Sequence, residues 1–326
     1  MSDRTDASKA ARVACAGILV ADIFVPPLPT LPQAGALLAT DDFLLDTGGC
    51  AANTGTVLAR LGGSVSVCGV VGDDVFADFI ERKLRAEGLD TTAIRRGPGG
   101  TSKTVVLTVK GEDRRFIHTF GANTQFTADD LAHPSLAGAG VLYLGGYLIL
   151  PALDPAATAQ ALRSFRERGT KVFLDVVVPA DGVSRLDAIA PLLPHVDVFK
   201  PNNEEAEALT GLAEPRAQAE RLMALGCRSV IISQGSKGTL YADSSGVWEA
   251  GVYTVDFVDG SGAGDAFAAG YILGLQEGMG VEDRLRFAGA TGALACTKLG
   301  CTTGITTRRA AEELVASQEL EVKRIG

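Results

Sequence analysis

The chain has 326 residues, of which 46 % are hydrophobic and 21 % are charged, and its formal net charge is −9. This length and composition suffice for a large buried core in one large domain or two smaller ones. The negative charge, with no cluster of five or more Lys/Arg residues, argues against nucleic acid or an anionic membrane as a partner and favours small metabolites.

The first apolar stretch, Val13 to Val25, predicts a buried strand rather than a secretory signal. Asp22 interrupts it at the strand's end, and no small-residue cleavage site follows. No other segment reaches the roughly 18 to 20 uninterrupted apolar residues of a membrane helix. The six cysteines and three histidines show no zinc-ligand spacing. We therefore expect a cytoplasmic protein with a disordered polar tail at residues 1–11.

A candidate substrate site follows at Thr47 to Asn53, just before a helical pattern. Gly48 and Gly49 would allow close approach of the backbone to a ligand, and Asn53 offers a donor and an acceptor to a polyol. Asp22 would add an acceptor-only carboxylate. The alternative is structural, with Asp22 capping a turn and Asn53 simply part of the helix.

Segments rich in apolar and β-branched residues then alternate with helical patterns. The strand patterns are Val65–Val71, Val141–Tyr147, Lys171–Val178, Val196–Lys200 and Ser229–Ser233. The helical patterns are Thr56–Leu61, Phe76–Glu87, Pro155–Arg168, Asn203–Thr210 and Ala217–Leu225. Such alternation implies parallel strands covered by helices on both faces, so the predicted fold class is α/β.

One region departs from the alternation. Lys103–Lys110 and Arg115–Phe120 predict two strands joined by Gly111-Glu112-Asp113, which indicates a hairpin. Together with the strand-like Ala36–Leu45 they would form a small accessory sheet, with lid segments at about 33–47 and 101–121, that excludes water from a phosphoryl donor. An extension of the main sheet is the alternative. An exposed lid sheet leaves edges and an apolar face to cover, so dimerisation through it is expected.

Two turns in the later part of the chain have residues that suit a nucleotide and its metal ion. Asn202 and Glu205 fall within one turn where a strand ends and a helix begins, and their oxygens suit hydrated magnesium; a capping box would have the same spacing. A second turn leaves a strand through glycines, as a nucleotide-binding turn or a plain hairpin turn would. That turn consists of Ser233, Gln234, Gly235, Ser236, Lys237 and Gly238.

The most informative stretch is the Gly-rich run from Asp259 to Phe267, which opens an apolar helix. The backbone of Gly262, Ala263 and Gly264, at the positive end of that helix, predicts an anion site. Asp265 would repel phosphate but is well placed to accept a proton from an attacking hydroxyl, so it is a candidate general base. The alternative is an ordinary capped loop. The glycine spacing fits neither a dinucleotide fingerprint, which argues against a nicotinamide oxidoreductase, nor a P-loop.

Several motifs, each weak alone, occur in the same order as in the ribokinase-like (PfkB) sugar kinases. The chain resembles this family over about residues 13–314. The motifs are Gly48-Gly49 with Asn53, Gly72-Asp73-Asp74, Asn202 with Glu205, Ser233-x-Gly235-x-x-Gly238, and GAGDAF at Gly262–Phe267. The resemblance implies a three-layer α/β/α domain over residues 12–320, with a mainly parallel central sheet and a small β-sheet lid, followed by a tail at 321–326. It also implies ATP-dependent phosphorylation of a sugar or nucleoside hydroxyl, with Mg²⁺ and often a monovalent cation such as K⁺.

The resemblance also implies roles for individual residues. Asp265 would be the base, the backbone from Gly262 to Asp265 the anion hole, and Asp22, Gly48, Gly49 and Asn53 the substrate contacts. Asn202 and Glu205 would position magnesium, indirectly, and the phosphates. The nucleotide would be held by the turn Ser233, Gly235, Ser236, Lys237 and Gly238, with Lys237 near its phosphates, and Gly264 would also bind the cofactor. Oxygen atoms of Asp259 and Ser261, with carbonyls of the 295–304 loop, would hold the monovalent cation.

Departures from the family pattern bear on the substrate and the cation. Gly260 stands where the DTTGAGD pattern has threonine, which loosens the turn beside the cation residues. Cys50-Ala51-Ala52 and Gly145-Gly146-Tyr147 differ from ribokinases proper and disfavour ribose. The absence of an Arg/Lys cluster near Asp22 favours an unphosphorylated sugar over a sugar phosphate.

Two other functions stay open at this point. A nucleoside could be the substrate, with Phe116 or Phe120 of the lid stacking on its base. A metabolite sensor could keep the fold without turnover, although such a protein would need neither Asp265 nor the GAGD turn.

Overall fold

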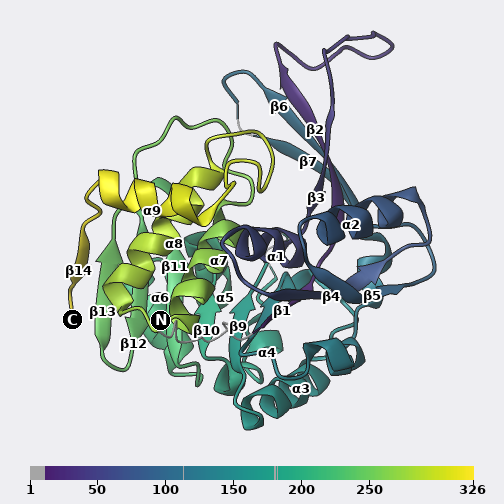
Figure 1. The fold of residues 1–326 in the computed structure, drawn as a ribbon. Helices are drawn as coiled ribbons and strands as arrows, with labels where there is room; N and C mark the ends of the chain where they lie inside the picture. The colour runs from purple at the N-terminus through teal and green to yellow at the C-terminus, as the bar shows by residue number, and fades with distance from the viewer. Residues whose placement is uncertain (1–11, 113, 180, 182) are drawn as a thin grey trace, which may run out of the picture.

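The computed structural model describes residues 12–112, 114–179, 181 and 183–326. A ten-stranded sheet runs through the centre of this part of the chain (Figure 1). Its strand order is β14-β13-β12-β11-β10-β9-β8-β1-β4-β5. The strands are β1 Val13–Gly17, β4 Val65–Val71, β5 Asp90–Arg96, β8 Val141–Gly145, β9 Lys171–Asp175, β10 Val198–Lys200, β11 Ser229–Ser233, β12 Thr239–Asp243, β13 Gly246–Ala250 and β14 Val322–Arg324. The tail predicted at residues 1–11 and Asp113 of the predicted hairpin turn lie outside the described residues.

The strands from β5 to β11 pair in parallel, and β12, β13 and β14 extend the sheet in antiparallel fashion. The central strands are buried on both faces, and their side chains alternate between two hydrophobic clusters. In β1, for example, Cys15 contributes to one cluster, and Ala14 and Ala16 to the other. This two-sided burial explains why these strands appear in the sequence as short continuous apolar runs.

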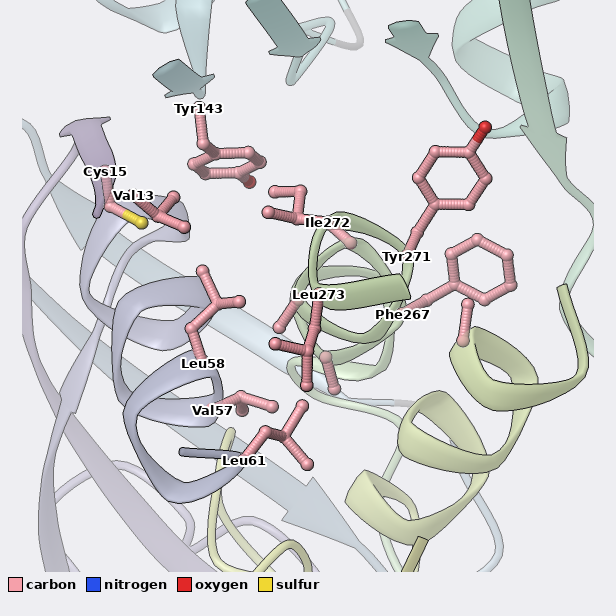
Figure 2. Packing of buried hydrophobic residues seen from close by; sticks show 14 of the residues in the cluster. Val13, Cys15, Val57, Leu58, Leu61, Tyr143, Phe267, Tyr271, Ile272 and Leu273 are labelled. Carbon is pink, nitrogen blue, oxygen red and sulfur yellow. The ribbon is translucent and has the colours of Figure 1, made fainter. Parts of the chain in front are cut away.

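Helices cover both faces and complete a three-layer α/β/α arrangement. The helices are α1 Cys50–Arg60, α2 Val75–Ala86, α3 Pro155–Glu167, α4 Leu186–Ile189, α5 Asn203–Thr210, α6 Pro215–Met223, α7 Ala263–Gln276, α8 Val281–Ala295 and α9 Arg308–Ser317, with 3-10 turns at Gly121–Gln125, Ala128–Ala132, Pro134–Leu136, Tyr147–Ile149, Leu193–His195 and Gly235–Lys237. α1, α2, α7, α8 and α9 pack on one face, and α3 to α6 on the other. Figure 2 shows the first cluster, where Leu58 and Leu61 of α1 lie near Ile272 and Leu273 of α7.

A second, smaller sheet projects from this body and forms the lid (Figure 1). Its strand order is β3-β2-β6-β7, formed by β2 Val20–Leu28, β3 Leu44–Gly48, β6 Lys103–Val109 and β7 Arg115–Thr119. β6 and β7 form the antiparallel hairpin that the sequence predicts. All residues of β7 are exposed, so it is an open sheet edge.

The single strand predicted at Val13–Val25 is wrong, because the chain changes sheets within it. β1 ends at Gly17 in the main sheet, and β2 starts at Val20 in the lid. Gly17 makes this break possible, since its φ is 137° and an added Cβ would lie 2.1 Å from the carbonyl oxygen of Gly145. Asp22 therefore belongs to the lid sheet instead of ending the first strand.

Several predicted boundaries also shift. The strand expected at Ala36–Leu45 begins only at Leu44, because the residues before it have no neighbouring strand and Leu37 is 96 % exposed. β8 and β9 end earlier than predicted, at the residues where polar and glycine-rich turns begin. The predicted C-terminal tail at 321–326 contains β14, which pairs with β13 at the sheet edge. None of the helices in the described part of the chain combines the length and apolar character that crossing a bilayer requires.

Candidate active site

The predicted catalytic turn lies at the N-terminus of α7. Gly262 precedes this helix in the left-handed region, with φ 73°, and an added Cβ would lie 2.1 Å from the carbonyl oxygen of Cys301, so the position requires glycine. Within the described residues no side chain caps this helix. The first turn, Ala263 to Asp265, therefore presents backbone N–H groups and the positive end of the helix dipole toward a ligand.

Asp265 is held in this turn by two residues of α1. Asn53 of α1 donates a hydrogen bond from Nδ2 to Asp265 Oδ2 at 2.8 Å, and the Thr54 hydroxyl lies 3.3 Å from the Asp265 carbonyl oxygen. Burial raises the pKa of Asp265 to about 6; Asp175 adds to this rise, whereas Asn53 and Lys200 oppose it. At neutral pH Asp265 is thus ionised but basic enough to accept a proton.

Asn53 is part of helix α1 and also lies in the candidate site. The two alternatives considered from the sequence, a helix residue and a substrate contact, are therefore compatible. α1 begins after Gly49, whose φ is 89° and whose added Cβ would lie 2.4 Å from the carbonyl oxygen of Ile18. The Asn53 side chain is 3 % exposed, and among the described residues its Oδ1 has no hydrogen-bond partner. A buried, unsatisfied acceptor costs free energy, so this atom suits a donor on a ligand, such as a sugar hydroxyl.

The lid strand β2 brings Asp22 to the same place. Gly48 lies beside it, since an added Cβ would come within 1.7 Å of Asp22 Oδ2. Burial raises the pKa of Asp22 to about 6; hydrogen bonds from Thr104 and Cys301 oppose the rise, and the charges of Asp46 and Asp265 add to it. The structure therefore brings together all of the predicted substrate contacts and Asp265.

Thr104 and Cys301 also lie in the candidate site, beside Asp22, and the sequence interpretation did not include them. Thr104 lies opposite Asp22 in the parallel β2–β6 pair, and Cys301 Sγ lies 3.8 Å from Asp22 Oδ2. The sequence placed both residues near the site only indirectly. Thr104 belongs to a predicted lid strand, and Cys301 belongs to the loop whose carbonyls were expected beside a cation. Neither residue carries a motif of its own.

A buried ion pair beneath the catalytic turn was also missed. Asp175 ends β9 and Lys200 ends β10, and Lys200 Nζ lies 3.1 Å from Asp175 Oδ2. Tyr143 of β8 donates to the same oxygen at 3.2 Å and lies 3.5 Å from Asp265 Oδ1. Asp175 and Lys200 are 5 % and 4 % exposed. The sequence feature that could have indicated Asp175 and Lys200 is that each is a charged residue at the end of a buried parallel strand. Ligands of α/β folds usually bind where the carboxyl ends of such strands meet.

Lys200 keeps its positive charge and lies close to the predicted anion hole. Burial opposes the charged form, but Asp175 and then Asp265 outweigh it, and the pKa of Lys200 is raised. An added Cβ on Gly264 would lie 3.3 Å from Lys200 Nζ. A buried ammonium group therefore lies on the side of Gly264 where a side chain would stand, and its positive charge would favour an anion bound at the exposed Gly264 backbone.

Asn202 and Glu205 form the capping box that the spacing allowed. Asn202 Oδ1 accepts from the Glu205 N–H and Glu205 Oε2 from the Asn202 N–H, both at 2.8 Å. Burial raises the pKa of Glu205 to about 7. Within the described residues no group of three or more His, Cys, Asp or Glu side chains could hold a metal on its own, so a metal here would need phosphate oxygens and water as further ligands.

The predicted nucleotide turn also has the geometry of its alternative, a hairpin turn between β11 and β12. Gly238, with φ 93°, lets the chain turn where an added Cβ would lie 2.1 Å from the Ala250 carbonyl oxygen. An isolated parallel bridge links Asn202 to Ser233, so the turn lies beside the capping box. Gly235, Ser236 and Lys237 are exposed there and accessible to a nucleotide.

Asp259 and Ser261, predicted to hold a monovalent cation, are paired with an arginine. Arg114 Nη1 lies 3.0 Å from Asp259 Oδ1 and 2.7 Å from Ser261 Oγ. The Gly300 N–H lies 3.3 Å from Asp259 Oδ2, and Asp259 is 4 % exposed. A lid residue therefore contacts the turn that precedes the anion hole.

Comparison with known proteins gives a consistent result. Residues 10–308 match the family model described as pfkB family carbohydrate kinase. Over 287 residues the chain is 27 % identical to 5-dehydro-2-deoxygluconokinase of Clostridium perfringens, covering 84 % of this chain and 85 % of the relative. The ribokinase of Arabidopsis thaliana, solved with ribose and ATP, superposes with a TM-score of 0.77 at 23 % identity, covering 94 % of this chain and 99 % of that one. An E. coli structure with ATP and Mg²⁺ gives 0.80 at 22 % identity, covering 94 % and 100 %.

Proposed function

Because the chain belongs to the pfkB family of carbohydrate kinases, we propose that it transfers the γ-phosphate of ATP to a hydroxyl of a small unphosphorylated sugar. The observation that carries the proposal is the position of Asp265. Its carboxylate lies in the first turn of α7, is oriented by Asn53, and has a pKa raised to about 6 by burial. Such a base is ionised at pH 7 and can take a proton from an alcohol as the new bond forms.

In the proposed reaction the hydroxyl oxygen attacks the γ-phosphorus and its proton passes to Asp265. The bond from the γ-phosphorus to the β–γ bridging oxygen breaks, and ADP leaves with that oxygen. The N–H groups of Gly262, Ala263 and Gly264 stabilise the charge on the phosphoryl group in transfer, and Lys200 adds a fixed positive charge from behind Gly264. This chain's contribution is therefore orientation and electrostatics around a positioned proton acceptor.

The residues present fit ATP and magnesium. Glycine at position 264 avoids a side chain that would meet Lys200, and its exposed backbone is open to phosphate, with the charge of the buried Lys200 close by. Asn202 and Glu205 lie next to Ser233, and the exposed Gly235–Lys237 turn would hold the nucleotide. Magnesium, held indirectly through Glu205, would neutralise charge on the donor phosphates. ATP and Mg²⁺ in the E. coli neighbour support this assignment.

The acceptor site favours neutral hydroxyl compounds. Asp22, Asp46 and Asp265 place three carboxylates in or beside it, and Lys83 pairs with Asp46. Asp22 offers only acceptor atoms when ionised, and Asn53 Oδ1 is a further acceptor in need of a donor. Hydroxyl groups satisfy these atoms, whereas a substrate carboxylate or phosphate would be repelled.

A nucleoside is the second candidate acceptor. Phe116 and Phe120 lie on the lid hairpin, are 59 % and 45 % exposed, and offer ring faces on which a base could stack. The same exposed edge, with Ile117 at 64 %, supports our proposal that the lid sheets of two copies pair. Sedimentation at micromolar protein tests the dimer, and a monomer there would refute it. A cytoplasmic location, as the sequence predicts, would supply ATP.

The test of the proposed function is ADP release from Mg-ATP with four acceptor classes: neutral sugars, keto-deoxy sugar acids, sugar phosphates and nucleosides. We expect turnover with a neutral sugar and little with its phosphate ester. Turnover with nucleosides alone would establish the second candidate. If the protein binds ATP but releases no ADP with any of the acceptors, the result would favour a non-catalytic metabolite sensor.

A further inference from the structure

We propose that Arg114 of the lid takes the place of the monovalent cation beside the Gly-rich turn, so that this protein neither binds nor requires K⁺ there. The proposal rests on the proposed function, since it concerns the turn that would bind phosphate. It differs from what the family resemblance implies, in which oxygen atoms of Asp259 and Ser261 would hold the cation.

The geometry places a fixed cation on those atoms. Arg114 Nη1 donates to Asp259 Oδ1 at 3.0 Å and to Ser261 Oγ at 2.7 Å. Ser261 also turns toward Asp259, since its Oγ and its backbone N lie 3.0 and 3.1 Å from Asp259 Oδ1. The Asp259 carboxylate is buried, so its pairing with a guanidinium is only weakly screened by solvent.

The set of donor atoms does not suit a second positive charge. A cation coordinated by Asp259 Oδ1 and Ser261 Oγ would share both atoms with the guanidinium and lie within a few ångström of it. The two positive charges would repel strongly at that separation. Asp259 Oδ2 already accepts from the Gly300 N–H at 3.3 Å. The carboxylate is therefore neutralised by the protein itself.

A second departure in the sequence makes room for this pairing. An added Cβ on Gly260 would lie 3.6 Å from Arg114 Nη2 and 3.7 Å from the ring of Phe257. These are ordinary van der Waals distances, and we expect the two further atoms of a threonine, the family's usual residue at this position, to come closer to the guanidinium or the ring. Arg114 also stacks over Phe116, with 5.7 Å from Cζ to the ring centroid. Gly260 and Arg114 are thus explained by one arrangement.

Arg114 lies between β6 and β7, at the turn of the lid hairpin, so the positive charge beside Asp259 is supplied by the lid.

The test compares the wild-type protein with Arg114→Ala, and with Arg115→Ala as a matched control from the same hairpin. Arg115 pairs with the exposed Glu112, and within the described residues it forms no hydrogen bond or ion pair with the Gly-rich turn. Two readouts need no turnover: ²⁰⁵Tl NMR with Tl⁺ as a K⁺ probe, and Tm in KCl against tetramethylammonium chloride at equal ionic strength. ADP release in the same two salts is the third.

We expect wild type and Arg115→Ala to show no Tl⁺ binding, no K⁺-specific Tm shift, and ADP-release rates within about twofold in both salts. Arg114→Ala should bind Tl⁺, gain Tm with K⁺, and lose roughly tenfold or more of its rate without K⁺, as expected for losing one electrostatic stabiliser. K⁺ should restore part of that rate.

Specific Tl⁺ binding or K⁺ activation of the wild type would overturn the proposal, as would an Arg114→Ala protein that does not respond to K⁺. If Arg114→Ala does not fold, Arg114→Lys and Gly260→Thr replace it, with Gly260→Thr expected to weaken the pairing and admit Tl⁺. The absence of turnover with every acceptor would count against the proposed function only, because Tl⁺ binding and Tm decide the cation question independently.

Discussion

Asn53 Nδ2 donates a hydrogen bond to Asp265 Oδ2 at 2.8 Å, which links the first turn of α1 to the first turn of α7 across 212 residues of sequence. One amide thus orients the proposed base, while its other atom, Oδ1, is buried and open to a ligand. Substrate binding and base orientation therefore depend on the same side chain.

Replacing Asn53 with Ala should raise KM and also lower kcat, by roughly tenfold or more, because both the substrate contact and the orientation of Asp265 are lost. Asn53→Asp should be worse, since a second carboxylate next to Asp265 would raise the pKa of the base. Steady-state kinetics of both variants, with Asn123→Asp as an unrelated buried asparagine for comparison of Tm, separate the effects. A change in KM alone would show that Asn53 does not orient the base.

The pH dependence follows from two raised pKa values. Burial raises the pKa of Asp265 and of Asp22 to about 6, so both carboxyl groups gain protons as the pH falls through that value. The base is then blocked and an acceptor in the sugar site is lost. We expect kcat/KM to fall on the acid side of about pH 6 with a slope near two, as for coupled groups. Asp22→Asn should reduce the slope toward one; a flat profile down to pH 4.5 would contradict both assignments.

Replacing Gly48 with Ala should damage the sugar site by steric displacement. The added Cβ would lie 1.7 Å from Asp22 Oδ2, so the carboxylate must move or the strand pairing must shift. We expect KM for the acceptor to rise roughly tenfold or more, with little change in ATP affinity. Gly280→Ala is the matched control, because its added Cβ meets no atom within 4 Å and its φ of −58° suits alanine. Equal KM values in the two variants would remove Gly48 from the site.

Replacing Lys200 with Met should weaken catalysis by removing the charge behind Gly264. Asp175 would lose its partner in a buried position and become protonated, so a loss of stability is expected as well. We expect kcat to fall at least tenfold and Kd for ATP to rise. Lys171→Met, at the exposed start of β9, serves as the control. Unchanged kcat in a folded Lys200→Met protein would show that the charge does not reach the phosphoryl group.

The sequence predicted the α/β architecture well because its parallel strands are buried on both faces and leave continuous apolar runs. It failed where the fold depends on distant atoms. The break between β1 and β2 depends on the contact of Gly17 with Gly145, which no local pattern reveals. The strand expected at Ala36–Leu45 failed because alternating apolar residues do not show whether a partner strand exists.

The residues of the candidate site also fall into two groups, those that local sequence patterns indicate and those that only the three-dimensional structure reveals. Asp265, Asn53 and Gly48 could be selected as candidates because they lie at glycine turns and helix starts, and the structure places them close together. Tyr143 and Asp175 carry no motif, and their contact with each other exists only because β8 and β9 are neighbours in the sheet. Arg114 was missed because its partners lie far away in the sequence, on a turn that the lid reaches only in three dimensions.

The most direct test of the central claim compares Asp265→Asn with the wild type, measuring ADP release with the best acceptor and ATP binding by calorimetry. The account predicts that kcat falls roughly 10²-fold or more while the Kd for ATP changes little, because the base acts on the acceptor hydroxyl. Retention of most of the activity by a folded Asp265→Asn protein would contradict the assignment of Asp265 as the general base.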